Sequence, residues 1–235
     1  MKLLLISNST NAGDSYLNHP REQIADFLGR EIRKVLFFPY AAVTFSYDDY
    51  LKKVQERFAE LGYQVDSIHN FNLPKEAVKQ SDAIVVGGGN TWMLSKKIHE
   101  LDLVDVLREK VLTGTPYIGW SAGANMACPT IMTTNDMPVA DPRGFHAFHF
   151  VPFQINPHYL DANPEGHAGE TRQQRIEEYI TVNPDRYVVG LREGTMLLVN
   201  NNRVELVGKR PARIFRFGKD PIETEPGGDL NFVME

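Results

Sequence analysis

The chain has 235 residues, of which 42% are hydrophobic and 23% charged, and its formal net charge is -5. This composition is ordinary for a globular protein, and the length suffices for one large domain with a buried core. Because the chain is mildly acidic and has no cluster of basic residues, we expect it to bind neither nucleic acid nor a membrane surface.

Cysteine usage and the N-terminal segment indicate the compartment. The single cysteine, Cys128, excludes a disulfide within the chain and suits a reducing environment. The apolar run before Ser7 is too short for a signal peptide or a membrane span. We therefore expect a soluble, cytoplasmic protein.

The first half of the chain alternates short apolar runs with helical patterns. Continuous apolar runs are typical of strands that are buried on both faces of a parallel sheet. Such runs occupy residues 3–6, 35–38 and 83–86, and a shorter one surrounds Tyr117 and Ile118.

Helices are predicted between these strands. Apolar residues recur at helical spacing over 48–61, and Gly62 then provides a C-terminal stop. The same pattern covers 103–112, before Gly114. Alternating strands and helices predict a doubly wound α/β fold with a mostly parallel sheet and right-handed crossovers.

The region after Cys128 is less regular. Residues 129–169 are rich in Pro, Asn, Asp, Gly and His, and so long a loop region is usually functional or misinterpreted. A helix is expected over about 170–179, with Thr171 or Gly169 as its N-terminal cap.

Short strands are expected in the last part of the chain. The stretches 186–191 and 195–200 are predicted strands, joined by the tight turn Arg192-Glu193-Gly194. Further short strands and turns follow them. Because we find no repeat, linker or low-complexity segment, we expect a single domain over 1–235.

The first stretch that could carry chemistry is GWSAG at 119–123, which has the G-x-S-x-G spacing of a nucleophile elbow. An apolar strand precedes it and small residues follow it. Such an elbow would expose the Ser121 hydroxyl above the sheet and direct the N–H of Ala122 at a developing oxyanion. The alternative is a packing turn that happens to contain a serine.

A second glycine-rich stretch, VVGGGNT, follows the predicted strand at 83–86. It does not match the dinucleotide pattern G-x-G-x-x-G, because Trp92 occupies the third glycine position counted from Gly87. A Walker lysine is also missing. The remaining interpretations are a tight turn or an oxyanion hole in which Gly88 and Gly89 donate their N–H groups.

A serine hydroxyl needs a base to take its proton. We prefer His158, in INPHY, because the Asn-Pro pair predicts a rigid turn at a strand end. The other histidines are expected to be solvated (His19, His69, His99), to pack beside phenylalanines (His146, His149) or to lie in the glycine-rich EGHAGE (His167).

The base in turn needs an acid that fixes its tautomer. Asp136 in TTNDMP and Glu193 in the Arg-Glu-Gly turn are the candidates, and either could be a plain turn residue. Ser121, Asp136 and His158 would follow the chain order of α/β-hydrolases. We find no pattern of metal ligands and no cofactor motif, so we expect neither.

The stretches VVGGGNT, GWSAGAN, TTNDMP, INPHY, PEGHAGETRQQRI and the Arg-Glu-Gly turn occur in this order along most of the chain. Together they resemble the aspartyl dipeptidase family, peptidase E. The resemblance implies a class-I glutamine-amidotransferase-like fold with a serine in place of the cysteine nucleophile. It also implies hydrolysis of dipeptides that have an N-terminal L-aspartate, without a cofactor.

The resemblance implies roles for individual residues. Ser121 corresponds to the nucleophile and His158 to the base. Asp136 matches an aspartate that is assigned to the charge relay, and Glu193 a glutamate that orients the histidine. We favour Glu193 as the orienting residue and expect Asp136 to shape the pocket, for example by pairing with the substrate's α-ammonium.

Selectivity for aspartate requires a cation. Arg172, in GETRQQR, matches the family position, and its guanidinium can bind a carboxylate bidentately. The plain alternative is a solvated helix arginine. Asn90, after the glycines, is a second candidate substrate-binding residue.

Other functions remain open at this point. A related peptidase for another acidic substrate, or an esterase, would use the same fold and nucleophile. A non-catalytic binding protein on this fold would leave Ser121 unreactive, and the glycine spacing disfavours a dinucleotide-binding module. The expected partners are small Asp-X dipeptides, and the chain is expected to be a monomer or a homodimer.

Overall fold

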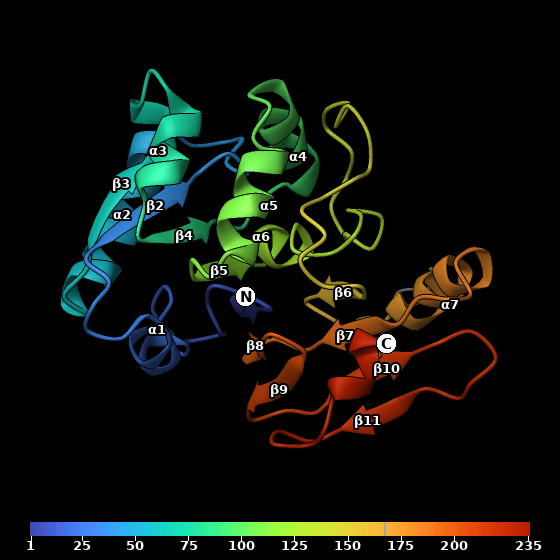
Figure 1. The fold of residues 1–235 in the computed structure, drawn as a ribbon. Coiled ribbons are helices and arrows are strands. Elements are labelled where there is room, and N and C mark those ends of the chain that lie inside the picture. The colour runs from blue at the N-terminus through green and yellow to red at the C-terminus, as the bar shows by residue number, and fades with distance from the viewer. Residues whose placement is uncertain (167) are drawn as a thin grey trace.

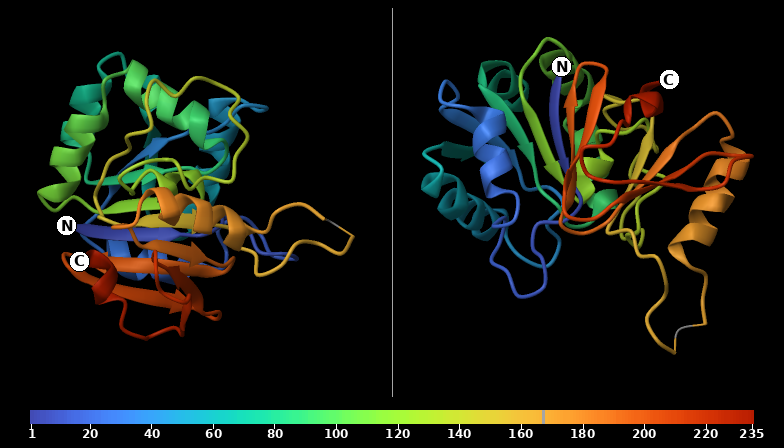
Figure 2. Two further views of the ribbon diagram at one scale, coloured as in Figure 1. Left: turned by 90° about the vertical axis from the view of Figure 1, so that its right-hand side faces the viewer. Right: turned by 90° about the horizontal axis from the view of Figure 1, so that it is seen from below.

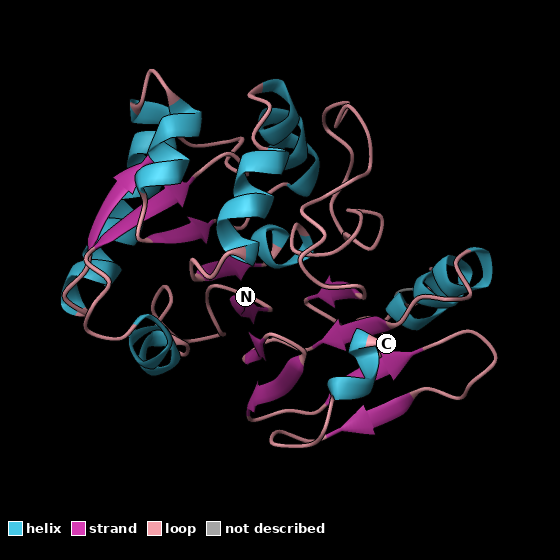
Figure 3. Cartoon of the chain, viewed as in Figure 1, coloured by secondary structure: helices cyan, strands magenta, loops and turns pink. Residues whose placement is uncertain are grey.

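The computed structural model describes residues 1–166 and 168–235. Figures 1 and 3 show a central sheet with helices on both sides and a smaller sheet beside it. The central sheet has seven strands in the order β3-β2-β4-β5-β1-β8-β9. They are β1 (Lys2–Ile6), β2 (Lys34–Phe38), β3 (Gln64–Ser67), β4 (Ala83–Val86), β5 (Tyr117–Trp120), β8 (Thr195–Asn200) and β9 (Arg203–Gly208).

The strands β1 to β5 run parallel to one another, and β8 and β9 complete one side in antiparallel pairing. This arrangement confirms the predicted mostly parallel α/β sheet. Because parallel strands end at the same edge, the segments after β1, β4 and β5 meet there.

Helices bury both faces of the central sheet. In β1, Leu3 and Leu5 join the hydrophobic core on the side of α3, α4 and α5, whereas Leu4 and Ile6 join the core on the side of α1 and α2. This is why the strand sequences are continuously apolar rather than alternating. The helices are α1 (Arg21–Leu28), α2 (Tyr47–Glu60), α3 (Pro74–Gln80), α4 (Thr91–Glu100), α5 (Val104–Leu112), α6 (Ala122–Asn125) and α7 (Arg172–Val182), with 3-10 turns η1 (Ile68–Asn70) and η2 (Asn231–Met234).

The second sheet has four strands in the order β11-β10-β7-β6. Its strands β6 and β7 are parallel, and Val189 and Leu191 of β7 belong to the same core cluster as Leu3 of the central sheet. The single domain over 1–235 stays a prediction. The strands are β6 (Gln154–Pro157), β7 (Val188–Leu191), β10 (Ala212–Phe215) and β11 (Ile222–Thr224).

The predicted strands at 186–191 and 195–200 lie in different sheets. The first corresponds to β7 in the second sheet, and the second to β8, which pairs with β1 in the central sheet. The turn at 192–194 therefore carries the chain from one sheet to the other.

Three helices lie close to their predicted positions. The helix predicted at 48–61 is α2, capped by Ser46, and the helix predicted at 103–112 is α5. The third is α7, where Thr171 and Gln174 form a capping box. The sequence analysis did not predict α1, α3 and α4, which have 8, 7 and 10 residues, or several short strands.

The irregular region contains a short strand and much buried chain. β6 lies within it, and Phe148, Phe150 and Phe153 are buried in the central core. The part between β6 and α7 includes the chain around residues 160–166, which extends away from both sheets (Figure 2).

Candidate active site

Ser121 lies between β5 and the short helix α6. Its φ of 53° and ψ of -111° lie outside the regions that residues with a side chain ordinarily adopt. Its N–H donates to the carbonyl of Ile6 at 2.9 Å, and its carbonyl accepts from Asn125 at 3.0 Å. The strained turn predicted for an elbow is therefore present at the shared edge of β1 and β5.

The two glycines of the motif are required by close packing. A Cβ at Gly119 would lie 2.4 Å from the carbonyl oxygen of Gly123, and a Cβ at Gly123 would lie 2.2 Å from that of Val86. Both distances are far below van der Waals contact. The G-x-S-x-G spacing thus lets α6 pack directly on β4 and β5, and this packing fixes the position of Ser121.

His158 lies between Ser121 and Glu193. Its Nε2 is 2.9 Å from the Ser121 Oγ, and its Nδ1 is 2.7 Å from Glu193 Oε1. His158 follows β6 and Glu193 follows β7 by two residues. Because β6 and β7 are parallel neighbours, their carboxyl ends bring the imidazole and the carboxylate together.

Two polar residues after β1 connect this pair to the central sheet. The buried Ser7 hydroxyl accepts from the His158 N–H at 2.9 Å and donates to the Leu191 carbonyl at 2.7 Å. Asn8, also buried, accepts from the Gly194 N–H at 2.8 Å. The sequence analysis missed both residues, although their place directly after the first strand was a usable signal.

Arg192 ties the two loops of the site together. Its guanidinium, with the side chain 9% exposed, donates to Asp161 at 2.9 Å and to Glu223 at 2.8 Å. Asp161 lies three residues after His158, and Arg192 directly precedes Glu193. The hydrogen bond from Arg192 lowers the pKa of the Asp161 carboxyl below its ordinary value.

The glycine-rich segment after β4 lies against the elbow. A Cβ at Gly88 would be 3.0 Å from the Ser121 Cβ, and Gly89 has a φ of 131°. Within residues 1–166 and 168–235, neither Gly88 nor Gly89 donates its N–H to another group. Ala122 is the first residue of α6, where helical N–H groups are free. These three N–H groups are available beside Ser121.

The orientation of the glycine-rich segment is fixed by Tyr50. Its hydroxyl donates to the Gly88 carbonyl at 2.9 Å and accepts from Trp120 Nε1 at 3.1 Å. Burial raises the pKa of Tyr50 to about 12, so the hydroxyl keeps its proton at neutral pH. With its carbonyl held by Tyr50, Gly88 cannot turn easily.

Asp136 does not contact the imidazole. Its Oδ2 accepts from the Thr91 N–H at 2.8 Å, the Thr91 hydroxyl at 2.6 Å and the Thr134 hydroxyl at 3.1 Å. It thereby stabilises the N-terminus of α4. Its Oδ1 accepts no hydrogen bond from the described residues, and Asp136 lines the same cleft as Ser121 and His158.

Asn90 is the N-terminal cap of α4. Its Oδ1 accepts from the Met93 N–H at 3.0 Å, and its Nδ2 donates to the Met137 carbonyl at 2.9 Å. Asn90 is not among the residues that line the cleft. Both the oxygen and the nitrogen of the Asn90 side-chain amide are therefore hydrogen-bonded to backbone groups.

Arg172 is the first residue of α7 and lies outside the cleft. It lines a separate depression together with Leu160, Glu170 and Arg175, and it forms no ion pair with a described residue. Burial lowers the pKa of the Arg172 guanidinium, and the charge of Arg175 adds to this effect, whereas Asp136 opposes it.

The other histidines differ from expectation. His19 and His99 are half-buried, and His69 is bonded on both ring nitrogens, to Ser67 at 2.6 Å and Asp48 at 3.0 Å, so the expectation of solvated rings was wrong. His146 and His149 are exposed, because only the neighbouring Phe148 and Phe150 turn inward. His167 lies outside the described residues.

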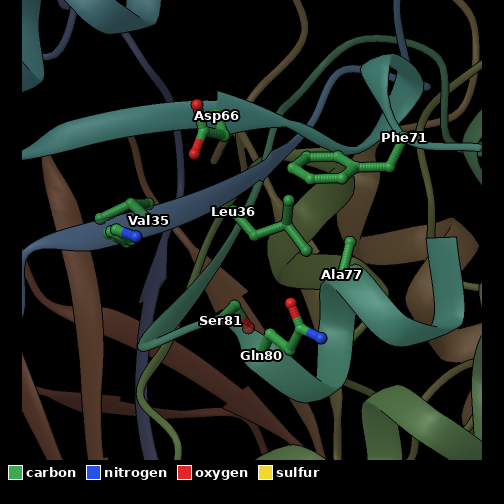
Figure 4. A pocket seen from close by; sticks show the side chains of 8 residues that line it. Val35, Leu36, Asp66, Phe71, Ala77, Gln80 and Ser81 are labelled. Carbon is green, nitrogen blue, oxygen red and sulfur yellow. The ribbon is translucent and has the colours of Figure 1, made fainter. Parts of the chain in front are cut away.

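The cleft above Ser121 has a volume of about 680 Å³. A cavity of about 130 Å³ lies elsewhere, between β2, β3 and α3, and includes Asp66, Phe71 and Gln80 (Figure 4). It contains none of the proposed catalytic residues. Among the described residues, no cluster suited to a metal ion is found, and no helix is long and apolar enough to cross a membrane.

Comparison with known proteins identifies the family of the chain. The model of Peptidase family S51 matches residues 3–207. A peptidase E of Nostoc sp. is 49% identical and is matched over 97% of its length by 100% of this chain. A peptidase E of Salmonella typhimurium is 46% identical, over 97% of this chain and 99% of that protein.

Solved structures of lower identity share the fold. A peptidase from an acI-B1 actinobacterium has a TM-score of 0.72 at 17% identity, over 97% of this chain and 96% of that one. A putative peptidase E protein from Listeria monocytogenes has a TM-score of 0.65 at 21% identity, over 88% and 98%. Because a family model covers most of the chain and full-length relatives are nearly half identical, the chain belongs to peptidase family S51 and is a serine-type peptidase.

Proposed function

We propose that the chain is a dipeptidase that hydrolyses dipeptides with an N-terminal L-aspartate through an acyl-enzyme on Ser121. The observation that carries the proposal is the continuous chain of hydrogen bonds from Ser121 through His158 to Glu193. This chain supplies a nucleophile, a base and a carboxylate that orients the base.

The first half of the reaction forms the acyl-enzyme. The Ser121 oxygen attacks the carbonyl carbon of the N-terminal aspartate while its proton passes to His158 Nε2. The N–H groups of Gly88 or Gly89 and of Ala122 stabilise the oxyanion. The C–N bond then breaks, and His158 gives its proton to the leaving amine.

The second half releases aspartate. Water loses a proton to His158 and attacks the ester carbonyl, and the proton then returns to Ser121. Glu193 accepts a hydrogen bond from His158 Nδ1, so it keeps the Nε2 lone pair directed at the serine and stabilises the imidazolium. Glu193 thus acts through His158 and is a positioning residue.

Recognition of the N-terminal aspartate would use Asp136 and Arg172. The α-ammonium would pair with Asp136, whose Oδ1 has no partner among the described residues while Oδ2 is held by Thr91. The aspartate side chain would pair with Arg172, which has no acidic partner of its own in the described chain. Because the guanidinium lies outside the cleft, its side chain must turn toward Asp136 when substrate binds.

The direct test is hydrolysis of Asp-Leu by the purified protein and by Ser121→Ala. Wild type should release aspartate and leucine, and the variant should lose at least about 1,000-fold in kcat. A fluorophosphonate should label wild type at Ser121 alone. A wild-type protein that cleaves Asp-Leu no faster than Ser121→Ala would refute the proposal and favour a non-catalytic role.

The specificity is tested separately with Arg172→Ala. This change should lower kcat/KM for Asp-Leu by roughly 30-fold or more, since a charge-assisted pair is lost. Hydrolysis of simple esters that lack the carboxylate should change little. An equal loss on both substrates would remove Arg172 from aspartate recognition, and a panel of Asp-X, Glu-X and β-aspartyl peptides would then distinguish a related peptidase or an esterase.

A further inference from the structure

One wall of the cleft is formed by residues to which the mechanism assigns no role. Lys53, on α2, lines the cleft together with Ser121, and its ammonium lies 4.3 Å above the centre of the Tyr16 ring. The Tyr16 ring packs edge-on against Trp120 at 6.3 Å between centroids, and Trp120 directly precedes Ser121. A continuous path of packed rings therefore sets the position of the ammonium relative to the nucleophile.

Acidic side chains outnumber lysine and arginine among the described residues that line the cleft. Among the described residues that line it, Lys53 is the only lysine or arginine, while Asp49 and Asp136 are acidic. Asp49 lies one helical turn before Lys53 but accepts from the Ser46 hydroxyl at 2.6 Å, and Lys53 forms no ion pair within residues 1–166 and 168–235. The ammonium is thus available to a ligand.

An Asp-X dipeptide carries one charged group that the proposed aspartate site leaves unmatched. Asp136 and Arg172 account for the α-ammonium and the side-chain carboxylate. The remaining group is the C-terminal carboxylate, which is part of the leaving residue. Lys53 lines the cleft from α2, whereas Asp136 lines it from the segment that contacts the start of α4.

We propose that Lys53 binds the C-terminal carboxylate of the dipeptide and so forms the subsite for the leaving amino acid. This inference rests on the proposed Asp-X dipeptidase function. The ammonium over Tyr16 selects substrates by length. A substrate that ends one residue after the scissile bond presents a carboxylate to the ammonium, whereas a longer peptide presents a neutral amide there. Lys53 is therefore a specificity-determining residue that distinguishes dipeptides from longer chains.

The test compares Asp-Leu with Asp-leucinamide, which differ in that carboxylate alone. For Lys53→Met, we expect kcat/KM on Asp-Leu to fall about 10-fold through KM, because an exposed charge-assisted pair is lost. Its kcat/KM on Asp-leucinamide should stay within about 2-fold of wild type, since the amide does not use the ammonium. Lys53→Arg should retain most of the preference, and Lys52→Met, on the same helix but outside the cleft, should match wild type.

Two outcomes would overturn the subsite. Equal loss on both substrates would mean that Lys53 serves another group, and equal activity of wild type and Lys53→Met on both would mean that it binds nothing. Failure of the parent proposal is distinct from these outcomes, because wild type would then hydrolyse neither substrate.

Discussion

The two halves of the site are held in place by different physical means. Ser121 directly follows a strand of the central sheet, and the elbow there is fixed by backbone packing, because Gly119 and Gly123 allow α6 to touch β4 and β5. His158 and Glu193 follow strands of the second sheet and are fixed by side-chain hydrogen bonds and ion pairs. The proposed nucleophile should therefore be sensitive to added volume, and the proposed acid–base pair to removed charge.

The largest expected effect is removal of the Glu193 charge. Glu193→Gln keeps a similar shape but removes the stabilisation of the imidazolium, so kcat on Asp-Leu should fall on the order of 1,000-fold with little change in stability. The effect should be below that of a fully buried acid, because the Glu193 side chain is 43% exposed. Single-turnover acylation measures it directly.

Asp136→Asn is the matched comparison for this acid. Asp136 stabilises the first residue of α4 and does not contact His158, so its loss should raise KM and lower the melting temperature more than it lowers the acylation rate. If Asp136→Asn abolished acylation while Glu193→Gln left it near normal, the assigned roles would be reversed.

A comparable steric change in the other half is Gly123→Ala. The new methyl group would lie 2.2 Å from the Val86 carbonyl oxygen, so backbone must move and Ser121 with it. A displacement near 1 Å costs about 100-fold in rate, and overpacking costs about 3 kcal/mol in stability. Kinetics on Asp-Leu and urea unfolding measure the two effects.

Gly218→Ala controls for the general cost of a methyl group at a glycine. Gly218 has a φ of 71°, and a Cβ there would have no atom within 4 Å. Because an alanine is strained at this positive φ, the change should cost about 1–2 kcal/mol in stability but no activity. A fully active, stable Gly123→Ala would contradict the view that backbone packing fixes the nucleophile.

The same division explains what could be predicted from sequence. The elbow could be identified because its glycines and its buried strand are contiguous. His158 does lie at a strand end as expected, but the predicted Asn-Pro turn is wrong, because Asn156 and Pro157 are the last residues of β6. Ser7 and Asn8 could be found only through their place directly after the first strand, and Arg192 could not be found, since each acts on a residue more than 30 positions away. Which of Asp136 and Glu193 lies beside His158 likewise depends on the pairing of β6 with β7. Local sequence patterns do not reveal this pairing.

Arg192→Met tests whether the positions of His158 and Glu193 depend on charge, and it changes neither of these two residues. Its loss leaves Asp161 and Glu223 with only the longer contacts to Arg213, at 4.0 Å and 3.7 Å, and releases the turn that carries Glu193. We expect a loss of about 2 kcal/mol in stability, below the usual cost of breaking a buried pair because both carboxylates can rehydrate. The kcat should fall about 10-fold.

The exposed Arg203→Met is the control for a lost arginine charge, and it should change neither quantity. If Arg192→Met lowered stability but left kcat unchanged, the ion pairs would support the fold alone and would not position Glu193.

The smallest expected effect comes from Asp161→Asn and depends on pH. Arg192 lowers the folded pKa of Asp161 below its ordinary 3.8, so the folded chain binds this proton less readily than the unfolded chain. The stabilisation is therefore fully present above the unfolded pKa and is lost as the pH falls through the folded one. Because the Asp161 side chain is 56% exposed, solvent screening limits its contribution at pH 7 to about 1 kcal/mol.

Urea unfolding of wild type and Asp161→Asn should show that difference in stability at neutral pH, and the two stabilities should converge in acid. The control is Asp26→Asn, which changes an exposed acid without an ion pair in the described chain and should show no difference from wild type at pH 7. A difference between wild type and Asp161→Asn that persists undiminished below the folded pKa would assign the effect to packing of the side chain rather than to its charge.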